Sequence, residues 1–188
     1  MLLPKIETER FLLRTYTADD LKTLYILITD PDVTRFFPKD YSIKKEEVLA
    51  SLPRRMEKWR KHGFGQLGVF EKESRNFIGY CGLKYLENTP DVEIYYGFYK
   101  DFWGKGIATE AAKAVLRFGF EEVKLERIVG VTNPENIASQ KVLLKLGLEQ
   151  EKEMKRFYNV DAAYFSISRE NYKSDGAKYD LSYTEIDD

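Results

Sequence analysis

Cysteine and histidine are almost missing from this chain of 188 residues, which has one of each. A single cysteine, Cys81, cannot form an internal disulfide. Because it lies in an apolar stretch, we expect a small buried thiol and not a nucleophile. The single histidine, His62, leaves no zinc cluster and excludes Ser/Cys-His catalysis unless this residue serves. Since it precedes a glycine at the end of a predicted helix, we expect it at the surface. The composition therefore predicts no metal site.

The chain also lacks a long apolar run and an excess of charge of one sign. No stretch is long enough to span a bilayer, and residues 1–5 are too short and too soon charged for a signal peptide. The net charge is −1 and the pI is ≈ 6.0, whereas a general nucleic-acid binder is expected to be basic. These absences predict a cytoplasmic protein that binds neither membranes nor nucleic acid.

The length favours one domain, large enough to bury a substantial core. No internal repeat and no linker marks a second domain. Residues 173–188 are polar and acidic, so we expect a single domain over residues 1–172 followed by a loose C-terminal tail over 173–188.

The chain is organised around residues 102–112. Before them, the period-two apolar residues of 91–99 predict a strand, and after them residues 107–124 recur at helical spacing. Between strand and helix lie Gly104 and Gly106. The first N–H groups of a helix have no internal partner and carry partial positive charge, and glycines let such a backbone wrap around an anion. The pattern is compatible both with a phosphate-holding turn and with a sharp turn alone.

The remaining periodicities predict an α+β chain whose sheet is mostly antiparallel. Because the helix at 107–124 crosses between two strands, those two are expected to be parallel. The second helical region contains Pro53, which should kink or restart it. Further strands are expected at 8–14, 65–71, 77–83, 127–132, 148–155 and 163–168, and helices at 17–28, 44–61 and 136–146.

A run of basic residues lies on the predicted helix at 44–61. Such a run is most often a solvated helix face, and the alternative is a wall that attracts an acidic acceptor protein. Its members are Arg54, Arg55, Lys58, Arg60 and Lys61.

The motif Trp-Gly-Lys-Gly-Ile-Ala-Thr-Glu-Ala at 103–111 resembles the acyl-CoA loop of the GNAT superfamily of N-acyltransferases, in its RimJ/RimL-like branch. Gly106 and Ala108 match the superfamily pattern Gln/Arg-x-x-Gly-x-Gly/Ala, while Trp103 replaces its first residue. Residues 8–14 resemble the family's first strand, 77–83 its third, and 133–147 its second cofactor-contacting segment. The resemblance covers residues 6 to 168.

The resemblance implies a GNAT-like sheet of about seven strands with a splayed parallel pair and helices on both faces. Acetyl-CoA would enter between the strands at 92–99 and 127–132, without a metal. Backbone N–H groups near Phe98 and Tyr99 would hold the developing oxyanion, and Asn136 would bond the cofactor, although it also suits a helix N-cap. The loop residues implied in diphosphate binding are Trp103, Gly104, Lys105, Gly106, Ile107, Ala108 and Thr109.

The same resemblance supplies candidates for catalysis. Glu93 lies on the strand where superfamily members often carry a general base, and the alternative is a strand carboxylate that faces solvent or pairs with a lysine. Many members place a tyrosine acid at the position of Leu143, which leaves Ser139 as the candidate that stabilises the leaving sulfur. The alternative for Ser139 is a bond to a backbone carbonyl one turn earlier.

The acceptor is expected to be a primary amine. An α-amine, with a pKa about 2.6 below that of lysine, costs roughly 3.5 kcal/mol less to deprotonate at neutral pH, which favours a protein N-terminus such as that of a ribosomal protein. Acetylation of a polyamine or an aminoglycoside is an alternative. A non-catalytic acyl-CoA-binding module is another, because the family tyrosine is missing. The sequence leaves open whether the protein is a monomer or a homodimer.

Overall fold

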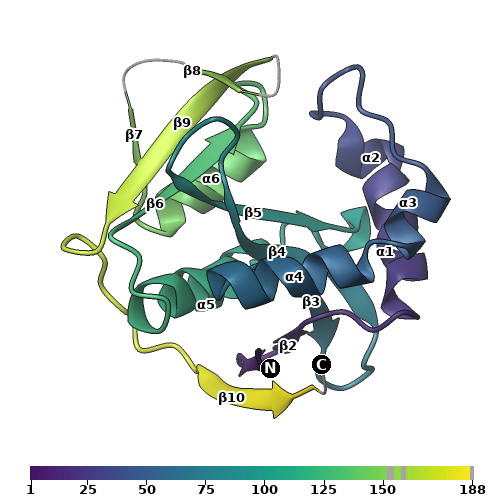
Figure 1. Ribbon diagram of the computed structural model, residues 1–188. Helices are drawn as coiled ribbons and strands as arrows, with labels where there is room; N and C mark the ends of the chain where they lie inside the picture. Colours follow the sequence, from purple (N-terminus) through teal and green to yellow (C-terminus); the bar gives the residue numbers. More distant parts are fainter. Residues whose placement is uncertain (152–154, 158–159, 187–188) are drawn as a thin grey trace.

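The computed structural model describes residues 1–151, 155–157 and 160–186. Its strands lie in the order β10-β1-β2-β3-β4-β5-β6-β9-β7, with β8 paired to β9 (Figure 1). Adjacent strands are antiparallel except β5 and β6. The strands are β1 Leu2–Glu7, β2 Phe11–Arg14, β3 Gln66–Glu71, β4 Phe77–Tyr85, β5 Val92–Phe98, β6 Arg127–Thr132, β7 Glu149–Gln150, β8 Lys155–Phe157, β9 Val160–Ser168 and β10 Asp180–Glu185.

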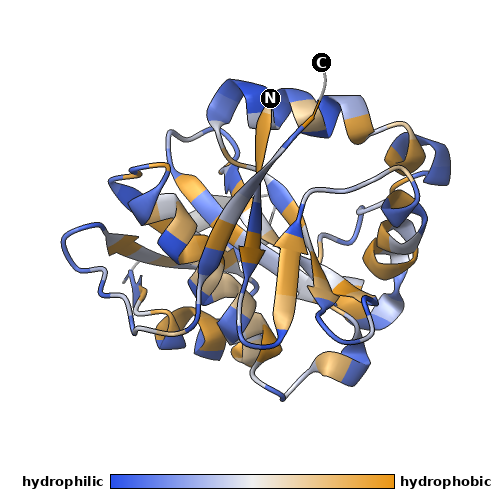
Figure 2. Ribbon diagram, turned by 90° about the horizontal axis from the view of Figure 1, so that it is seen from below, coloured by the Kyte–Doolittle hydropathy of each residue, from blue (hydrophilic) through white to orange (hydrophobic). Residues whose placement is uncertain are grey.

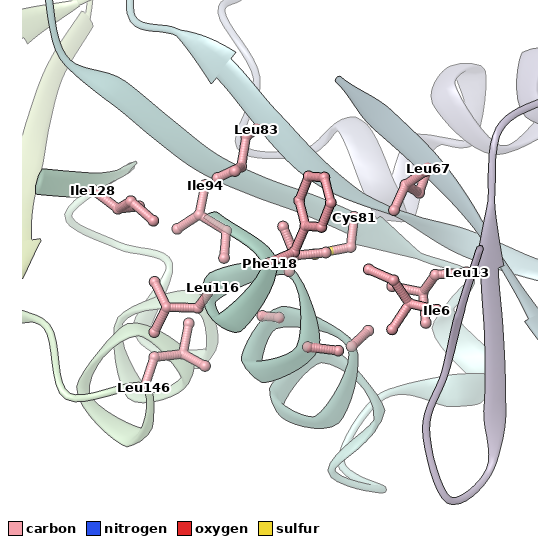
Figure 3. Close-up of a cluster of buried hydrophobic side chains, with 14 of the residues drawn as sticks. Ile6, Leu13, Leu67, Cys81, Leu83, Ile94, Leu116, Phe118, Ile128 and Leu146 are labelled. Carbon is pink, nitrogen blue, oxygen red and sulfur yellow. The ribbon is translucent and has the colours of Figure 1, made fainter. Parts of the chain in front are cut away.

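Helices cover both faces of this sheet, which confirms the predicted α+β class and the parallel pair. The main core lies between the sheet and α5, where Cys81, Ile94 and Phe118 meet (Figure 3). A second apolar cluster joins α1 to the opposite face of the sheet. Figure 2 shows that the helices carry both hydrophobic and hydrophilic residues, as helices with one buried face must. The helices are α1 Asp20–Thr29, α2 Pro31–Thr34, α3 Lys45–Leu49, α4 Leu52–His62, α5 Ile107–Glu121 and α6 Ile137–Lys145.

Helix α5 approaches the sheet closely because its inner face is built from small residues. A Cβ added to Gly119 would lie 2.7 Å from Ile128 and 3.0 Å from Leu83, so a larger residue would push the helix away. The outer side of α5 is covered as well, since the ring of Tyr172 packs 4.8 Å from that of Phe120. This close packing fixes the position of α5 on the sheet.

The first predicted strand, at 8–14, is in fact part of a hairpin: it contains the turn after β1 and then β2. Its turn is closed at Thr8, whose backbone N–H donates to the Phe11 carbonyl (2.9 Å) and whose Oγ1 accepts from the Phe11 N–H (3.1 Å). Strand β1 therefore ends before this turn and β2 begins after it. The hydroxyl of Thr8 bonds to the backbone and interrupts the extended chain, a competition for which threonine is well suited.

The expected loose tail is wrong for residues 180–185, which form β10. This strand pairs along the whole of β1, from Leu2 opposite Glu185 to Glu7 opposite Asp180. The pairing satisfies backbone groups at the outer edge of β1 that would otherwise lack partners in the sheet. Strand β10 brings the C-terminal segment back to the N-terminus (Figure 1).

The helical region at 44–61, which Pro53 was predicted to kink or restart, is restarted and contains two helices. Helix α3 ends at Leu49, the hydroxyl of Ser51 donates to the Val48 carbonyl (2.6 Å), and Pro53 lies in the first turn of α4. Proline is tolerated there because the first helical N–H groups have no partner. The strand predicted at 148–155 is short: β7 covers only Glu149–Gln150, and 152–154 lie outside the described residues.

Candidate active site

Strands β5 and β6 run parallel but pair at one position, Glu93 opposite Val129. Beyond it the two strands separate (Figure 1). On the other side of β5, the N–H of Tyr99 donates to the Ile78 carbonyl of β4 (3.2 Å). Backbone groups alternate between the two neighbours of a strand, so the N–H of Phe98 points to the side where β6 has diverged. Phe98 thus keeps the position predicted for an oxyanion donor, whereas the N–H of Tyr99 is already engaged.

The loop that follows β5 is fastened at both ends. Trp103 donates from Nε1 to the Phe98 carbonyl (2.8 Å), and Arg10 donates from a terminal guanidinium nitrogen to the Lys105 carbonyl (3.1 Å). Gly104 and Gly106 both adopt a φ of +74°, the left-handed region that favours glycine. Helix α5 begins directly after Gly106, and no side chain caps it. Its first N–H groups are therefore available to an anion.

A partly exposed polar network anchors the first turn of α5 and was not predicted from the sequence. Glu110 accepts from the Thr8 hydroxyl (2.7 Å), from the Arg10 backbone N–H (2.9 Å) and from Arg10 Nε (2.7 Å). Burial alone would raise the pKa of Glu110, but these hydrogen bonds and the Arg10 charge lower it below the ordinary value. The sequence gives no sign of this network, because the partners of Glu110 lie about a hundred positions away.

Helix α6 begins at Asn136, which acts as its N-cap: Oδ1 accepts from the Ser139 N–H (3.1 Å). This confirms the capping alternative for Asn136. Its side-chain amide still carries two N–H donors. One turn further along, Leu143 is buried and fills the space beside Gly130, where an added Cβ would lie 2.5 Å from its Cδ2. The position at which the family often carries tyrosine is therefore part of the core.

Tyr96 is the residue that sequence reasoning missed. Its hydroxyl reaches from β5 to α6, where it lies 3.1 Å from Ser139 Oγ and donates to the Ser139 carbonyl (3.2 Å). Burial raises the pKa of the Tyr96 phenol, the bond from Ser139 opposes the rise, and the charge of Glu93 adds to it. Tyr96 occupies a period-two apolar position in β5, so the pattern predicts a core residue and gives no sign of the hydroxyl contact.

Glu93 lies on the opposite face of β5 from Tyr96. It is only 4% exposed, and its carboxylate pairs with Nζ of Lys84 at 3.2 Å from the facing position of β4. The alternative predicted for Glu93, a strand carboxylate paired with a lysine, is thus observed. Although it is paired with Lys84, Glu93 lies at the position beyond which β5 and β6 diverge.

The structure brings most of the predicted site residues together around the C-terminal end of β5, within the sheet. Residues 103–109 form the loop and the first turn of α5, and Tyr96 links Ser139 to β5 beside the diverging strands. Two hollows lie nearby. One, of about 540 Å³, extends from Gly106 and Thr109 along α5 under residues 171–179; the other, of about 560 Å³, lies beside Arg14 and Phe102.

A mixed sheet with one diverging parallel pair, and a glycine loop that opens a helix beside it, define the acyl-CoA-dependent N-acyltransferase class. The sequence model of the acetyltransferase (GNAT) domain matches residues 10–149, so the chain belongs to this family. It is therefore an N-acetyltransferase, an enzyme that transfers an acetyl group from acetyl-CoA to an amine.

Similar proteins agree with this assignment. Uncharacterized protein YkkB of Bacillus subtilis (strain 168) is 32% identical over 165 residues, which cover 85% of this chain and 94% of the relative. The putative ribosomal N-acetyltransferase YdaF of the same strain is 31% identical over 104 residues, 50% of this chain and 57% of the relative. A crystal structure of an acetyltransferase (GNAT family) from Bacillus anthracis has a TM-score of 0.73 and 27% identity, over 88% of this chain and 99% of that one. No helix in the described part of the chain is long and apolar enough to cross a membrane.

Proposed function

We propose that the protein acetylates the N-terminal α-amine of another protein, such as a ribosomal protein, with acetyl-CoA as donor. The observation that carries the site assignment is the divergence of β5 and β6 next to an uncapped helix start. Similarity to a putative ribosomal N-acetyltransferase supports the acceptor class.

In this proposal the cofactor lies along the loop and across the diverging strands. The N–H groups from Gly106 to Thr109 hold the diphosphate, helped by the positive end of the α5 dipole. The side-chain amide of Asn136 donates to the cofactor, while its Oδ1 continues to cap α6. Trp103 and Arg10 contribute indirectly because they hold the loop in shape.

The acetyl group moves in one direct transfer. The neutral amine attacks the thioester carbon, and the Phe98 N–H stabilises the resulting oxyanion, a contribution of roughly 3–4 kcal/mol for a well-aimed donor. The C–S bond then breaks and leaves a thiolate, which accepts a hydrogen bond from Ser139 Oγ and takes up a proton from water. Glu93, directly or through water, receives the proton that the amine nitrogen loses.

A peptide panel tests this function. Peptides with a free α-amine and blocked lysines should be acetylated, peptides with a blocked α-amine and free lysines should react much more slowly, and mass spectrometry should locate the acetyl group on the first residue. The proposal fails if turnover requires a lysine side chain or occurs only with small amines such as polyamines.

A further inference from the structure

Arg55, from the basic run predicted on the second helical region, reaches the face of the sheet that carries Glu93. Arg55 donates from Nη1 to Gln66 Oε1 on β3 (2.5 Å) and lies over the ring of Tyr16 (5.1 Å). Lys84, the partner of Glu93, lies over the ring of Tyr95 (4.9 Å). Burial and the charges of its neighbours lower the pKa of Lys58. We define the basic surface as Arg54, Arg55 and Lys58 of α4 together with Lys84 of β4.

Among the described residues, carboxylates do not pair with the three cations that α4 contributes to this surface. Glu57, the acid on α4, pairs with Arg60 (2.6 Å), and Glu93 pairs with Lys84. In the described ranges, no ion pair involves Arg54, Arg55 or Lys58. The local excess contrasts with a net charge of −1 for the whole chain, so it is not the consequence of a generally basic composition.

Resting on the proposed function, we propose that the basic surface binds acidic residues that follow the acceptor's N-terminus. Arg54 and Lys58 are one helical turn apart, so they spread the positive charge over about 6 Å along α4. That length corresponds to roughly two residues of an extended peptide. A polypeptide with its amine at Glu93 and carboxylates at its second to fourth residues complements this arrangement.

The test compares peptides with the same first residue and with Glu, Gln or Lys at positions two to four. The parent enzyme should prefer the Glu peptide by about tenfold in kcat/KM at low salt, mostly through KM, and the preference should shrink with added salt. Arg54→Gln combined with Lys58→Gln should abolish the preference but leave turnover of the Gln peptide unchanged. Lys22→Gln with Lys124→Gln removes two exposed charges elsewhere and should leave the preference intact.

Equal kcat/KM for the Glu and Gln peptides in the parent, or an unchanged preference in the Arg54/Lys58 variant, overturns the inference. Such a result leaves the proposed function standing, since the peptides are still acetylated. If none of the peptides is acetylated at its α-amine, both the proposed function and this inference fail.

A separate observation concerns Tyr96. We infer that it is a positioning residue for Ser139. The serine N–H is held by Asn136, and its hydroxyl lies 3.1 Å from the Tyr96 phenol. A phenol has one proton, and Tyr96 donates it to the Ser139 carbonyl, so the phenol oxygen can accept from Ser139 Oγ and hold the serine side chain in place. Tyr96 thus positions the serine, to which we assign the task that other family members give to a tyrosine at the position of Leu143.

A double-mutant cycle tests this role. Tyr96→Phe should lower kcat about tenfold with little change in KM for acetyl-CoA, and Ser139→Ala should have a similar effect. The double variant should be no slower than Ser139→Ala, because the two side chains act as one unit. Tyr183→Phe, on the exposed strand β10, is the matched control. Multiplicative effects of the two variants, or a Tyr96→Phe enzyme as fast as the parent, would contradict the inference.

Discussion

The two faces of β5 differ in chemistry although they alternate along one short strand. On the α5 face, Ile94 and Phe98 are buried, and the single polar group, the Tyr96 hydroxyl, binds α6. On the other face, Glu93 pairs with Lys84, whose Nζ lies over Tyr95. The α5 face lies beside the uncapped start of α5, and the Glu93 face lies beside the basic surface.

This difference indicates how one strand serves two substrates. The α5 face provides backbone N–H groups and hydroxyls, which suit an anionic cofactor and its leaving sulfur. In the proposed function, the Glu93 face provides a carboxylate for the proton of the amine and cations for the groups that follow it. Variants on the two faces should therefore separate cofactor binding from acceptor turnover.

The largest effect is expected at Glu93. Glu93→Gln should lower acetyl transfer by 10²–10⁴-fold, the usual value of general-base assistance, and leave CoA affinity unchanged. With an α-amine of pKa near 8, the deficit should shrink as the pH rises, because more acceptor is already neutral. The measurement is kcat/KM against pH with a lysine-blocked peptide. An enzyme that equals the parent at every pH would mean that Glu93 only pairs with Lys84.

The next effect is expected in the glycine loop. Gly106→Val should weaken CoA binding at least tenfold, or ~1.4 kcal/mol, because a side chain would occupy the place of the diphosphate. The protein itself leaves room there: an added Cβ at Gly106 meets only Arg10, at 3.8 Å. Calorimetric titration with CoA measures the loss.

A matched control separates backbone strain from loss of the phosphate site. Gly63, at the end of α4, has a φ of +73° and open space around an added Cβ, much as Gly106 does. Gly63→Val should therefore cost about the same 1–2 kcal/mol of stability and leave CoA affinity intact. Equal CoA affinity in both folded variants would remove the diphosphate from this loop.

A smaller effect is expected at Glu110, which holds the start of α5. Glu110→Gln should destabilise the protein by about 1–2 kcal/mol at pH 7. Since folding lowers the pKa of Glu110, its ionised form stabilises the fold above the unfolded pKa of about 4.3, and this contribution is lost as the pH falls through the lower folded pKa. Urea unfolding of parent and variant should therefore converge in acid. Glu9→Gln, in the exposed turn nearby, should show no such gap.

The smallest effect on turnover is expected at Cys81. Burial raises the pKa of this thiol, so it remains protonated at neutral pH, and it lies in the core beneath α5 (Figure 3). Cys81→Ala should cost about 1 kcal/mol of stability and change turnover per folded molecule less than threefold. Loss of acetylation with an unchanged melting curve would mean that the thiol participates in the reaction.

The central part of the fold follows from local sequence signals. The strand before Gly104, the helix after Gly106 and the parallel pair were all predicted correctly, because period-two and helical spacing are properties of adjacent residues. Strand β10 was missed because its pairing partner lies at the other end of the chain. In retrospect Tyr179, Leu181 and Tyr183 alternate with polar residues, a strand pattern too short and exposed to stand out.

The site was less predictable than the fold. The loop residues and Asn136 came from resemblance and from helix-start chemistry, both of which can be recognised in sequence. The contacts that hold these residues cannot be recognised in sequence, since Arg10 reaches Lys105 and Tyr96 reaches Ser139 only in the folded chain. A tyrosine at an apolar strand position cannot reveal from sequence alone which helix its hydroxyl will meet.

A crystal structure with CoA tests the division between the two faces of β5 most directly. We predict the diphosphate on the N–H groups of Ile107 to Thr109, and the thiol sulfur within hydrogen-bond distance of Ser139 Oγ, with Glu93 and Lys84 on the far side of the strand. A diphosphate bound instead among Arg54, Arg55 and Lys58, or a thiol on the Glu93 face, would contradict this account.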